Sequence, residues 1–327
     1  MRNKMLATLV AMSLIFIGCA TPKIRLFPSQ ADPLKEHTLE GEADKKILVL
    51  PIKGIISDSP QEGFVRTKPS LVQEVVSQLR LAQKDDNIKA VLLKIDSPGG
   101  TVTASDILYN EIMSFKNRTG AIVVVSMMDV AASGGYYISM AADYIMAHPT
   151  TLTGSVGVIF MRPKVVDLMQ KIGVSVEVNK SGVYKDMGAP FRRTTAEENK
   201  ILQTMNDRLA IRFTDLVSKH RNIGSAAMGE ISTARVFLAN DALALGLVDE
   251  IGYLDQALAK AKKLADLPED AKVVVYRRNE YPDDNIFNTS TRYGGGDLSL
   301  ISLELPGALN RLQTGFYYMW PAAAMGV

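Results

Sequence analysis

The stretch IKAVLLKIDSPGG, residues 88–100, decides the fold of this chain. Residues 88–95 form a nearly continuous apolar run, which is typical of a strand buried on both faces of a parallel sheet. Pro98, Gly99 and Gly100 then end the strand, because proline and glycine favour a turn. In parallel α/β sheets, ligand sites gather at the carboxyl ends of the strands. The stretch therefore predicts a buried strand whose terminal turn contributes to a ligand site.

Similar apolar runs alternate with segments of helical periodicity along the rest of the chain. Strands are predicted at residues 47–52, 121–126, 144–147, 174–179 and 273–276. Helices are predicted at residues 70–82, 105–115, 133–141, 164–171, 195–222 and 257–264. The longest helix opens with Thr195 and Glu198, the pair of a capping box. Because strands that alternate with helices form largely parallel sheets, the sequence predicts the α/β class.

The composition is that of a globular protein. The chain has 327 residues, of which 47% are hydrophobic and 22% charged, and it is long enough to bury one large core or two smaller ones. The formal net charge is only +2, and two of the positive charges, Arg2 and Lys4, fall in the leader described next. A nearly neutral chain lacks the basic surface of a nucleic-acid-binding protein, so we expect no nucleic-acid partner.

Residues 1–18 have the layout of a secretory leader. Arg2 and Lys4 precede an apolar run over residues 5–17, and a glycine and Cys19 follow. The run is shorter than the ~20 residues that an ordinary membrane-spanning helix needs. Cys19 is the only cysteine, so a disulfide within one chain is impossible. An uncleaved N-terminal anchor and a secreted chain with one incidental cysteine are the alternatives.

The residues before Cys19 resemble a bacterial lipobox, in which an acylated cysteine becomes the new N-terminus. Phe16 stands where the motif prefers leucine. The resemblance implies a lipid anchor on Cys19 that holds the protein to a membrane at the periplasmic side of the bacterial cell envelope, since each buried methylene contributes roughly 0.8 kcal/mol. Ala20 stands where an inner-membrane retention signal has aspartate, which favours the outer membrane over the inner one.

The chain after the leader divides into three parts. Residues 19–45 are rich in proline and charged side chains, and we expect them to form a mobile tether. Residues 46–270 carry the pattern of strands and helices and are predicted to form the α/β domain. Residues 271–327 are a C-terminal extension, and its apolar end, residues 316–320, suits packing on a partner or a membrane.

Ser133 is the candidate nucleophile. It follows a predicted buried strand and two alanines and precedes two glycines, as in a strand-to-helix turn that presents a hydroxyl. The amide of Gly134, near a helix N-terminus, is placed to donate to an oxyanion. At the other turn, Gly99 and Gly100 offer further free amides. Each motif taken alone also has a structural explanation, as an N-capping serine or a tight turn.

The base that would activate this serine must be a histidine or a lysine. Of the three histidines, His37 lies in the predicted tether, His220 near the end of a long helix and His148 at a strand end. A lysine can serve if it is held neutral, which costs about 4 to 5 kcal/mol. Lys185, in a glycine-rich loop, is the candidate. Its neighbour Asp186 would oppose this role if the two side chains met, but adjacent side chains usually diverge.

Four motifs in a fixed order resemble the signal peptide peptidase A family of bacterial Ser-Lys peptidases: DSPGG (96–100), AASGGYYI (131–138), TGSVGV (153–158) and GVYKDMGAPFR (182–192). The resemblance spans residues 46–265 and is closest to the short, single-repeat members. It implies a ClpP/crotonase-like fold of repeated strand-strand-helix units, with a main sheet and a smaller perpendicular sheet surrounded by helices. It also implies a ring or dome-shaped homo-oligomer, such as an octamer, with active sites at the protomer interfaces.

The resemblance also assigns roles by position. Ser133 would be the nucleophile and Lys185 the general base, while Ser155 would hydrogen-bond to the lysine amine and orient it. Gly134 and Gly100 would supply the amides of the oxyanion hole. The implied reaction is the hydrolysis of peptides or unfolded proteins, among them remnant signal peptides, through an acyl-enzyme. This chemistry uses neither a cofactor nor a metal ion, and we expect neither.

Two other functions are compatible with the same fold. A crotonase-like acyl-CoA enzyme would stabilise an enolate with two backbone amides and would need no activated serine. A non-catalytic scaffold at the membrane would need a degenerate dyad, whereas Ser133 and Lys185 are both present. Covalent labelling of Ser133 by a fluorophosphonate separates the peptidase from the crotonase-like enzyme.

Overall fold

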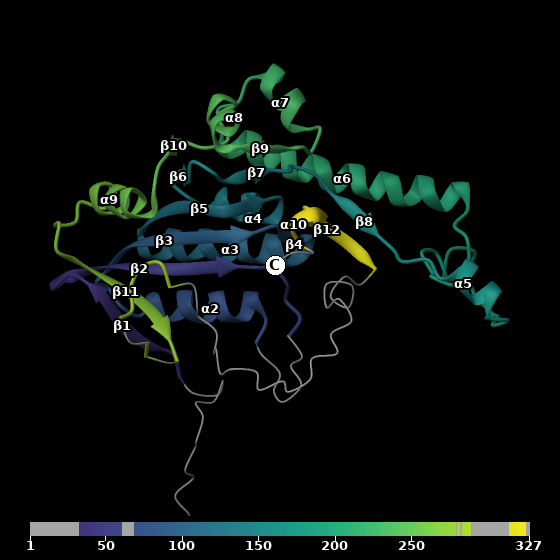
Figure 1. Cartoon of the computed structure of the whole chain (residues 1–327), viewed down its shortest axis with the longest axis horizontal. Helices are drawn as coiled ribbons and strands as arrows, with labels where there is room; N and C mark the ends of the chain where they lie inside the picture. The colour runs from purple at the N-terminus through teal and green to yellow at the C-terminus, as the bar shows by residue number, and fades with distance from the viewer. Residues whose placement is uncertain (1–32, 61–68, 279, 282, 289–313, 325–327) are drawn as a thin grey trace, which may run out of the picture.

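The computed structural model describes residues 33–60, 69–278, 280–281, 283–288 and 314–324 of the chain (Figure 1). Within these residues lie a main sheet of nine strands and a second sheet of three. The main sheet has the order β1-β11-β2-β3-β5-β6-β10, with β7 paired to β5 and β9 paired to β7. The α/β class with a main and a smaller sheet is therefore confirmed.

Parallel strands form the centre of the main sheet. They are β2 (Ala43–Lys53), β3 (Ile88–Ser97), β5 (Ile122–Ala132) and β6 (Tyr144–Ala147). Successive side chains of β2 alternate between two buried clusters, with Leu48 and Leu50 on one face and Ile47 and Val49 on the other. A sheet that is covered on both faces needs apolar residues at every position, which explains the continuous apolar runs in the sequence.

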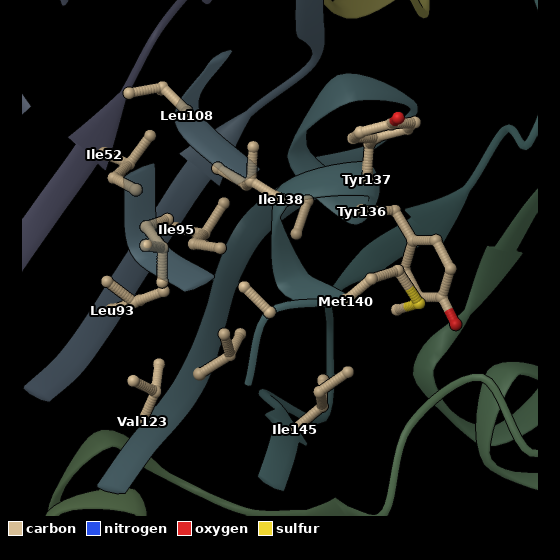
Figure 2. Close-up of a cluster of buried hydrophobic side chains, with 14 of the residues drawn as sticks. Ile52, Leu93, Ile95, Leu108, Val123, Tyr136, Tyr137, Ile138, Met140 and Ile145 are labelled. Atoms are coloured by element: carbon tan, nitrogen blue, oxygen red, sulfur yellow. The ribbon is translucent and has the colours of Figure 1, made fainter. Parts of the chain in front are cut away.

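Helices cover the two faces of this sheet (Figure 1). One buried cluster joins the sheet to α2 (Leu71–Ala82), α3 (Val102–Thr119) and α4 (Gly134–Ser139), and the other joins it to α9 (Leu254–Leu264). Figure 2 shows Leu93 and Ile95 of β3 in the same cluster as Ile138 of α4. Burial of such side chains, at roughly 25 cal/mol per Å² of apolar surface, holds α4 and the turn before it against the sheet.

The second sheet joins three short strands from distant parts of the chain. β12 (Gly315–Met319) lies between β4 (Gly99–Thr101) and β8 (Ile159–Met161) and is antiparallel to both. Tyr317 and Met319 of β12 pack on one side of this sheet against Ile159, while Tyr318 joins the main core on the other. The apolar C-terminal segment thus packs within its own chain.

An arm extends from the body after β8 (Figure 1). It contains α5 (Val166–Lys171), an irregular stretch with turns, and the predicted long helix α6 (Ala196–His220), whose capping box forms in both directions. The strand predicted at residues 174–179 was wrong. None of the described strands pairs with this stretch, so its backbone has no ladder to join and its valines are at least 43% exposed.

The remaining described elements belong to or border the main sheet, except α10, which packs with β12. They are α7 (Ser225–Ile231), α8 (Ala239–Ala244), α10 (Pro321–Ala324), β1 (Lys35–Glu40), β7 (Leu152–Gly154), β9 (Val236–Leu238), β10 (Glu250–Ile251) and β11 (Ala271–Arg277). Two of these strands, β1 and β11, lie outside the boundaries expected for the α/β domain, residues 46–270. β1 pairs antiparallel with β11, so residues 35–40 belong to the sheet and not to a tether. β11 lies between β1 and β2, so the domain continues past residue 270.

The predicted leader and Cys19 lie outside the described residues. Within the residues that are described, no helix combines the length and the apolar character that a membrane span requires. Lipid attachment at Cys19 therefore stays a prediction.

Candidate active site

Ser133 occupies the sharp turn between β5 and α4. Its backbone has φ 52° and ψ −112°, a combination that residues with a Cβ rarely adopt. The turn is held from both sides, because the Ser133 amide donates to the Gly154 carbonyl at 2.8 Å and its carbonyl accepts from the Tyr137 amide at 2.7 Å. Such a conformation costs about 1 to 3 kcal/mol and persists only where the surrounding structure imposes it.

The hydroxyl of Ser133 is buried without a partner. The residue is 1% exposed, and its Oγ forms no hydrogen bond with any of the described residues. Leaving a buried hydroxyl unpaired costs about 1 to 3 kcal/mol, and native proteins satisfy most such groups. A strained backbone and an unpaired hydroxyl at one residue are two separate costs in stability, which points to a role in function.

Gly99 lies against Gly134, the residue that follows Ser133. A Cβ placed on Gly99 would lie 2.7 Å from the Gly134 nitrogen, and one placed on Gly134 would lie 3.0 Å from the Gly99 Cα. Gly99 also has φ +100°, a conformation that favours glycine. The two turns predicted from the sequence therefore meet in space. Glycines at these positions let the amide of Gly134 lie against the end of β4.

The carbonyl of Tyr318 lies among these glycines. The Gly99 carbonyl accepts from the Ile56 amide at 2.9 Å and the Thr101 amide donates to the Ile56 carbonyl at 3.0 Å. Because backbone groups alternate along a strand, the amide and carbonyl of Gly100 face the other way, toward its partner Tyr318. A Cβ on Gly134 would lie 3.0 Å from the Tyr318 oxygen.

Ser155 follows β7 directly and adjoins the Ser133 turn. Ala132 pairs with Gly154 in the parallel β5-β7 ladder, so each serine comes immediately after a residue of one pair. Ser155 also has φ 52°, and its amide donates to the Arg235 carbonyl at 2.8 Å. The fold therefore brings Ser133 and Ser155 together from two neighbouring strand ends.

Lys185 is not brought to these serines within one chain. It lies in the turns of the arm, is exposed, and forms no side-chain hydrogen bond or ion pair with the described part of the chain. Its neighbour Asp186 bonds elsewhere, with the Arg192 Nε at 2.7 Å and the Lys180 Nζ at 2.8 Å. The contact with Asp186 that would oppose a neutral Lys185 is therefore absent from the described pairs, because Arg192 and Lys180 bind the carboxylate.

Arg192 ties the Lys185 turn to the start of α6. Its guanidinium contacts Asp186 on one side and Glu198, the acidic member of the capping box, on the other. Glu198 in turn accepts from the Thr195 amide at 2.9 Å. Hydrogen bonds from Arg192 and Thr195 lower the pKa of Glu198 to about 2, and those from Arg192 and Lys180 hold the pKa of Asp186 well below its usual range.

The histidines are engaged elsewhere, as expected for structural residues. His148 contacts Thr150 at 2.8 Å and packs edge-on against the Tyr253 ring. His220 contacts the Tyr109 hydroxyl at 2.8 Å, and burial lowers the pKa of its imidazole. His37 pairs through its backbone with Val275 in the sheet, and its Nε2 is buried without a hydrogen bond to the described residues. No cluster of side chains suited to a metal ion occurs among the described residues.

Part of this chain is similar to the Clp proteases. The family model for Clp protease matches residues 65–153, which contain both turns of the site. Among solved structures, a ClpP1 mutant from Listeria monocytogenes is 20% identical, with a TM-score of 0.42, over 64% of this chain and 94% of that one. The fold itself is mixed α/β with a main and a smaller sheet, and the Clp protease match covers the part of it that holds the two turns.

Sequence relatives then settle the family. The family model for peptidase family S49 matches residues 116–268. A protein of Enterococcus faecium assigned as a signal peptide peptidase SppA is 36% identical over 250 residues, which are 76% of this chain and 72% of that one. Protease 4 of Haemophilus influenzae is 32% identical over 82% of this chain, which spans 43% of that protein. The chain belongs to peptidase family S49, the signal peptide peptidase A family, and is a serine peptidase.

Two features of the site were missed by reasoning from sequence. The first is Tyr318, whose only signal was the apolar run FYYMW at residues 316–320. The second is Arg192, which stands inside the quoted GVYKDMGAPFR motif without a role. Neither contact follows from spacing, because each depends on where the C-terminal segment and the arm come to lie.

Proposed function

We propose that this serine peptidase uses a Ser-Lys dyad, with Ser133 as nucleophile and Lys185 as general base. The observation that carries the proposal is the Ser133 turn, where a strained backbone holds an unpaired hydroxyl and the next residue, Gly134, lies against Gly99. Strain of this kind clusters at active sites, because the geometry is needed for the chemistry and the rest of the fold holds it in place.

The reaction that follows is an acyl transfer. Neutral Lys185 takes the proton of Ser133 as its oxygen attacks a peptide carbonyl, and the amides of Gly134 and Gly100 stabilise the oxyanion. The C–N bond then breaks, and the lysine returns the proton to the departing amine. Water attacks the acyl-enzyme with Lys185 again as base, which releases the acid and restores Ser133. Ser155 orients the amine of Lys185.

Lys185 reaches Ser133 from a neighbouring protomer in this proposal. Two observations support it. Lys185 lies on the extended arm, away from a side-chain partner in the described chain. The same arm exposes apolar side chains, among them Leu168 at 58%, Ile172 at 63% and Val183 at 73%, which a protein interface would remove from water. A closed ring of protomers would bury it.

The proposed substrates are peptides or unfolded chains at a membrane, including remnant signal peptides. Support comes from the names of the relatives, one of which is a signal peptide peptidase. The lipobox-like residues before Cys19 support anchoring to a membrane of the cell envelope, with the outer membrane favoured by Ala20. Cleavage-site profiling with the mature protein would define the substrates.

Covalent labelling and one variant test the dyad. A fluorophosphonate should label Ser133 in the full-length protein, and Lys185→Ala should lower both labelling and peptide hydrolysis by about 10³-fold or more, since proton transfer by a positioned base contributes 10² to 10⁴. Lys171→Ala, at the exposed end of α5 on the same arm, is the matched control and should retain labelling. Retained turnover in Lys185→Ala would refute the dyad.

A further inference from the structure

Two buried cations, Lys94 and Arg277, lie on the face of the main sheet that α9 covers, opposite to α4. Lys94 comes two positions after Leu92 on β3, and Arg277 comes two positions after Val275 on β11. Each cation therefore shares the face of that apolar residue, because side chains alternate along a strand. Arg277 is 1% exposed and Lys94 3%. Charged side chains are almost never buried this fully unless they are paired, so the partners of both need to be accounted for.

The guanidinium of Arg277 is satisfied on one side only. Its Nη1 contacts the Asp284 carboxylate, whereas its Nε and Nη2 are buried and form no hydrogen bond with the described residues. These two nitrogens form one edge of the planar guanidinium, and such an edge binds a carboxylate through two parallel hydrogen bonds. Buried donors of a charged group are costly to leave unpaired. Arg277 thus holds an unpaired bidentate edge inside the protein.

Lys94 is held by main-chain carbonyls. Its Nζ donates to the carbonyl of Ile286 at 2.8 Å and to that of Phe287 at 2.9 Å. An ammonium has three donors, so one of them lacks an acceptor among the described residues. Asp284, which contacts Arg277, belongs to the same short segment as these two carbonyls. Both cations therefore lie beneath residues 284–287, each with donors to spare.

The charges around the two cations do not cancel. Asp96, two positions after Lys94 on β3, pairs with Lys53 at 3.2 Å, and Asp284 pairs with Arg277. One positive charge, that of Lys94, is left in excess among these groups. Burial, and then the nearby charge of Arg277, lower the pKa of Lys94 to about 8, so the lysine is still mainly protonated at neutral pH. An anion with a single charge would balance the group.

We infer that Arg277 and Lys94 form a binding site for a small carboxylate anion, separate from the proposed peptidase site. A carboxylate would accept two hydrogen bonds from Nε and Nη2 of Arg277 and a third from Lys94. Residues 283–288 cover these donors, which favours a small ion over a larger ligand. Binding should hold this segment more firmly to the sheet, because its Asp284 and its carbonyls bond to the same two cations.

Acetate is the probe for the first test, made on the full-length protein. At about 100 mM acetate and neutral pH, compared with chloride at the same ionic strength, we expect Tm to rise by about 4 °C or more, because a ligand with a Kd on the order of 1 mM that binds only the folded state stabilises it. Acetamide, which has a similar shape and no charge, is the control ligand and should give no rise. No rise with acetate, or an equal rise with acetamide, would overturn the inference.

Substitutions at the two cations locate the site. Arg277→Lys retains the positive charge and removes the bidentate edge, and Lys94→Met removes the charge at a similar side-chain length. Each should weaken acetate binding, measured by calorimetry, at least tenfold. Lys89→Met, at an exposed position of the same strand, is the matched control and should bind as the wild type does. Wild-type binding in both Arg277→Lys and Lys94→Met would overturn the assignment.

Hydrogen exchange in the wild-type protein covers the case in which a variant fails to fold. Acetate, and not acetamide, should slow exchange in residues 283–288 by about tenfold, because bound anion opposes the opening of this segment. A rise in Tm without this protection would show that acetate binds elsewhere and would overturn the inference. Ser133→Ala should retain the full effect of acetate, since the site does not depend on the proposed function of Ser133. Loss of the effect in that variant would place acetate at the peptidase site instead.

Discussion

The amide of Ser133 donates to the carbonyl of Gly154 at 2.8 Å, and this bond joins the two strand ends that carry the predicted catalytic serines. The bond orients two peptide groups relative to each other: the one between Ala132 and Ser133, and the one between Gly154 and Ser155. Both serines have φ 52°, so both side chains leave their strand at a sharp turn. A positive φ at two non-glycine neighbours is a rare combination, and it marks the place where we propose that the chemistry occurs.

Backbone strain at Ser133 leads to a prediction on stability. Ser133→Gly and Ser133→Ala should both abolish hydrolysis, but the glycine variant should be the more stable by about 1 kcal/mol, because glycine adopts φ 52° without a Cβ clash. Thermal denaturation of the two variants side by side measures the difference in stability. The control pair is Ser139→Gly and Ser139→Ala, inside α4, where the alanine variant should be the more stable. A more stable alanine variant at position 133 would show that the turn is not strained.

Shared active sites predict complementation between two inactive variants. Ser133→Ala retains Lys185, and Lys185→Ala retains Ser133, so a ring that contains both can form complete sites. Random mixing at equal amounts should restore about a quarter of wild-type hydrolysis per protomer, because one interface in four pairs the two intact residues. Each variant is also mixed with itself as the control. Absence of recovery after verified subunit exchange would place the dyad within one chain.

Ser155 is expected to act through Lys185 as a positioning residue. Ser155→Ala should lower kcat by about 10- to 100-fold, with a smaller change in KM, because the amine is less well aimed at Ser133. The acid limb of the pH–rate profile should shift as well, which a purely structural loss would not produce. Ser155→Thr, which retains the hydroxyl, should recover most of the loss. Unchanged kcat in Ser155→Ala would remove this residue from the site.

The Arg192 contacts predict how the charge near Lys185 is controlled. The charged groups whose hydrogen bonds and ion pairs hold this segment include Lys164, Lys180, Asp186, Arg192 and Glu198. Arg192→Gln leaves Asp186 paired with Lys180 alone, so more of its negative charge is available to stabilise a protonated lysine nearby. We expect the acid limb of the profile to move to higher pH and activity at neutral pH to fall severalfold, with recovery at alkaline pH.

The neighbouring arginine supplies the control for this experiment. Arg193→Gln removes a side chain that is 77% exposed and pairs with Asp167 on the surface, so it should leave the profile unchanged. Adding Asp186→Asn to Arg192→Gln should return the acid limb toward that of the wild type. If the double variant keeps the shift, the effect of Arg192 comes from the geometry of the turn and not from the freed charge.

The same contacts predict an acid-sensitive arm. Hydrogen bonds from Arg192 lower the pKa values of Asp186 and of Glu198, the latter to about 2, relative to the unfolded chain. Because these carboxyl pKa values are lower in the folded chain than in the unfolded chain, the two carboxylates stabilise the folded arm at pH values above about 4. This stabilisation is lost as the pH falls toward 2 and the carboxylates become protonated. Hydrogen exchange should therefore accelerate in residues 181–198 before it does in the central strands. Simultaneous loss of protection in both would contradict this order.

Much of the fold could be predicted because the decisive signals are local. The run at residues 88–95 is buried on both faces in β3, and the capping box at Thr195 begins α6 as expected. The Ser133 turn was predicted from the small residues around it. The strand predicted at residues 174–179 failed for the opposite reason: alternation indicates an amphipathic strand, but a strand also needs a neighbour to supply its hydrogen bonds.

Local signals in the sequence were enough to predict the class of sheet, the two glycine turns and the candidate residues for peptidase chemistry, because apolar periodicity and turn preference act over a few neighbouring positions. Three contacts became visible only in the folded chain: β1 joins the sheet, Asp186 bonds to Arg192, and Tyr318 pairs with Gly100. These contacts join segments through strand register and through the path of the arm. Spacing along the chain does not encode them, because their partners meet only once the core has packed.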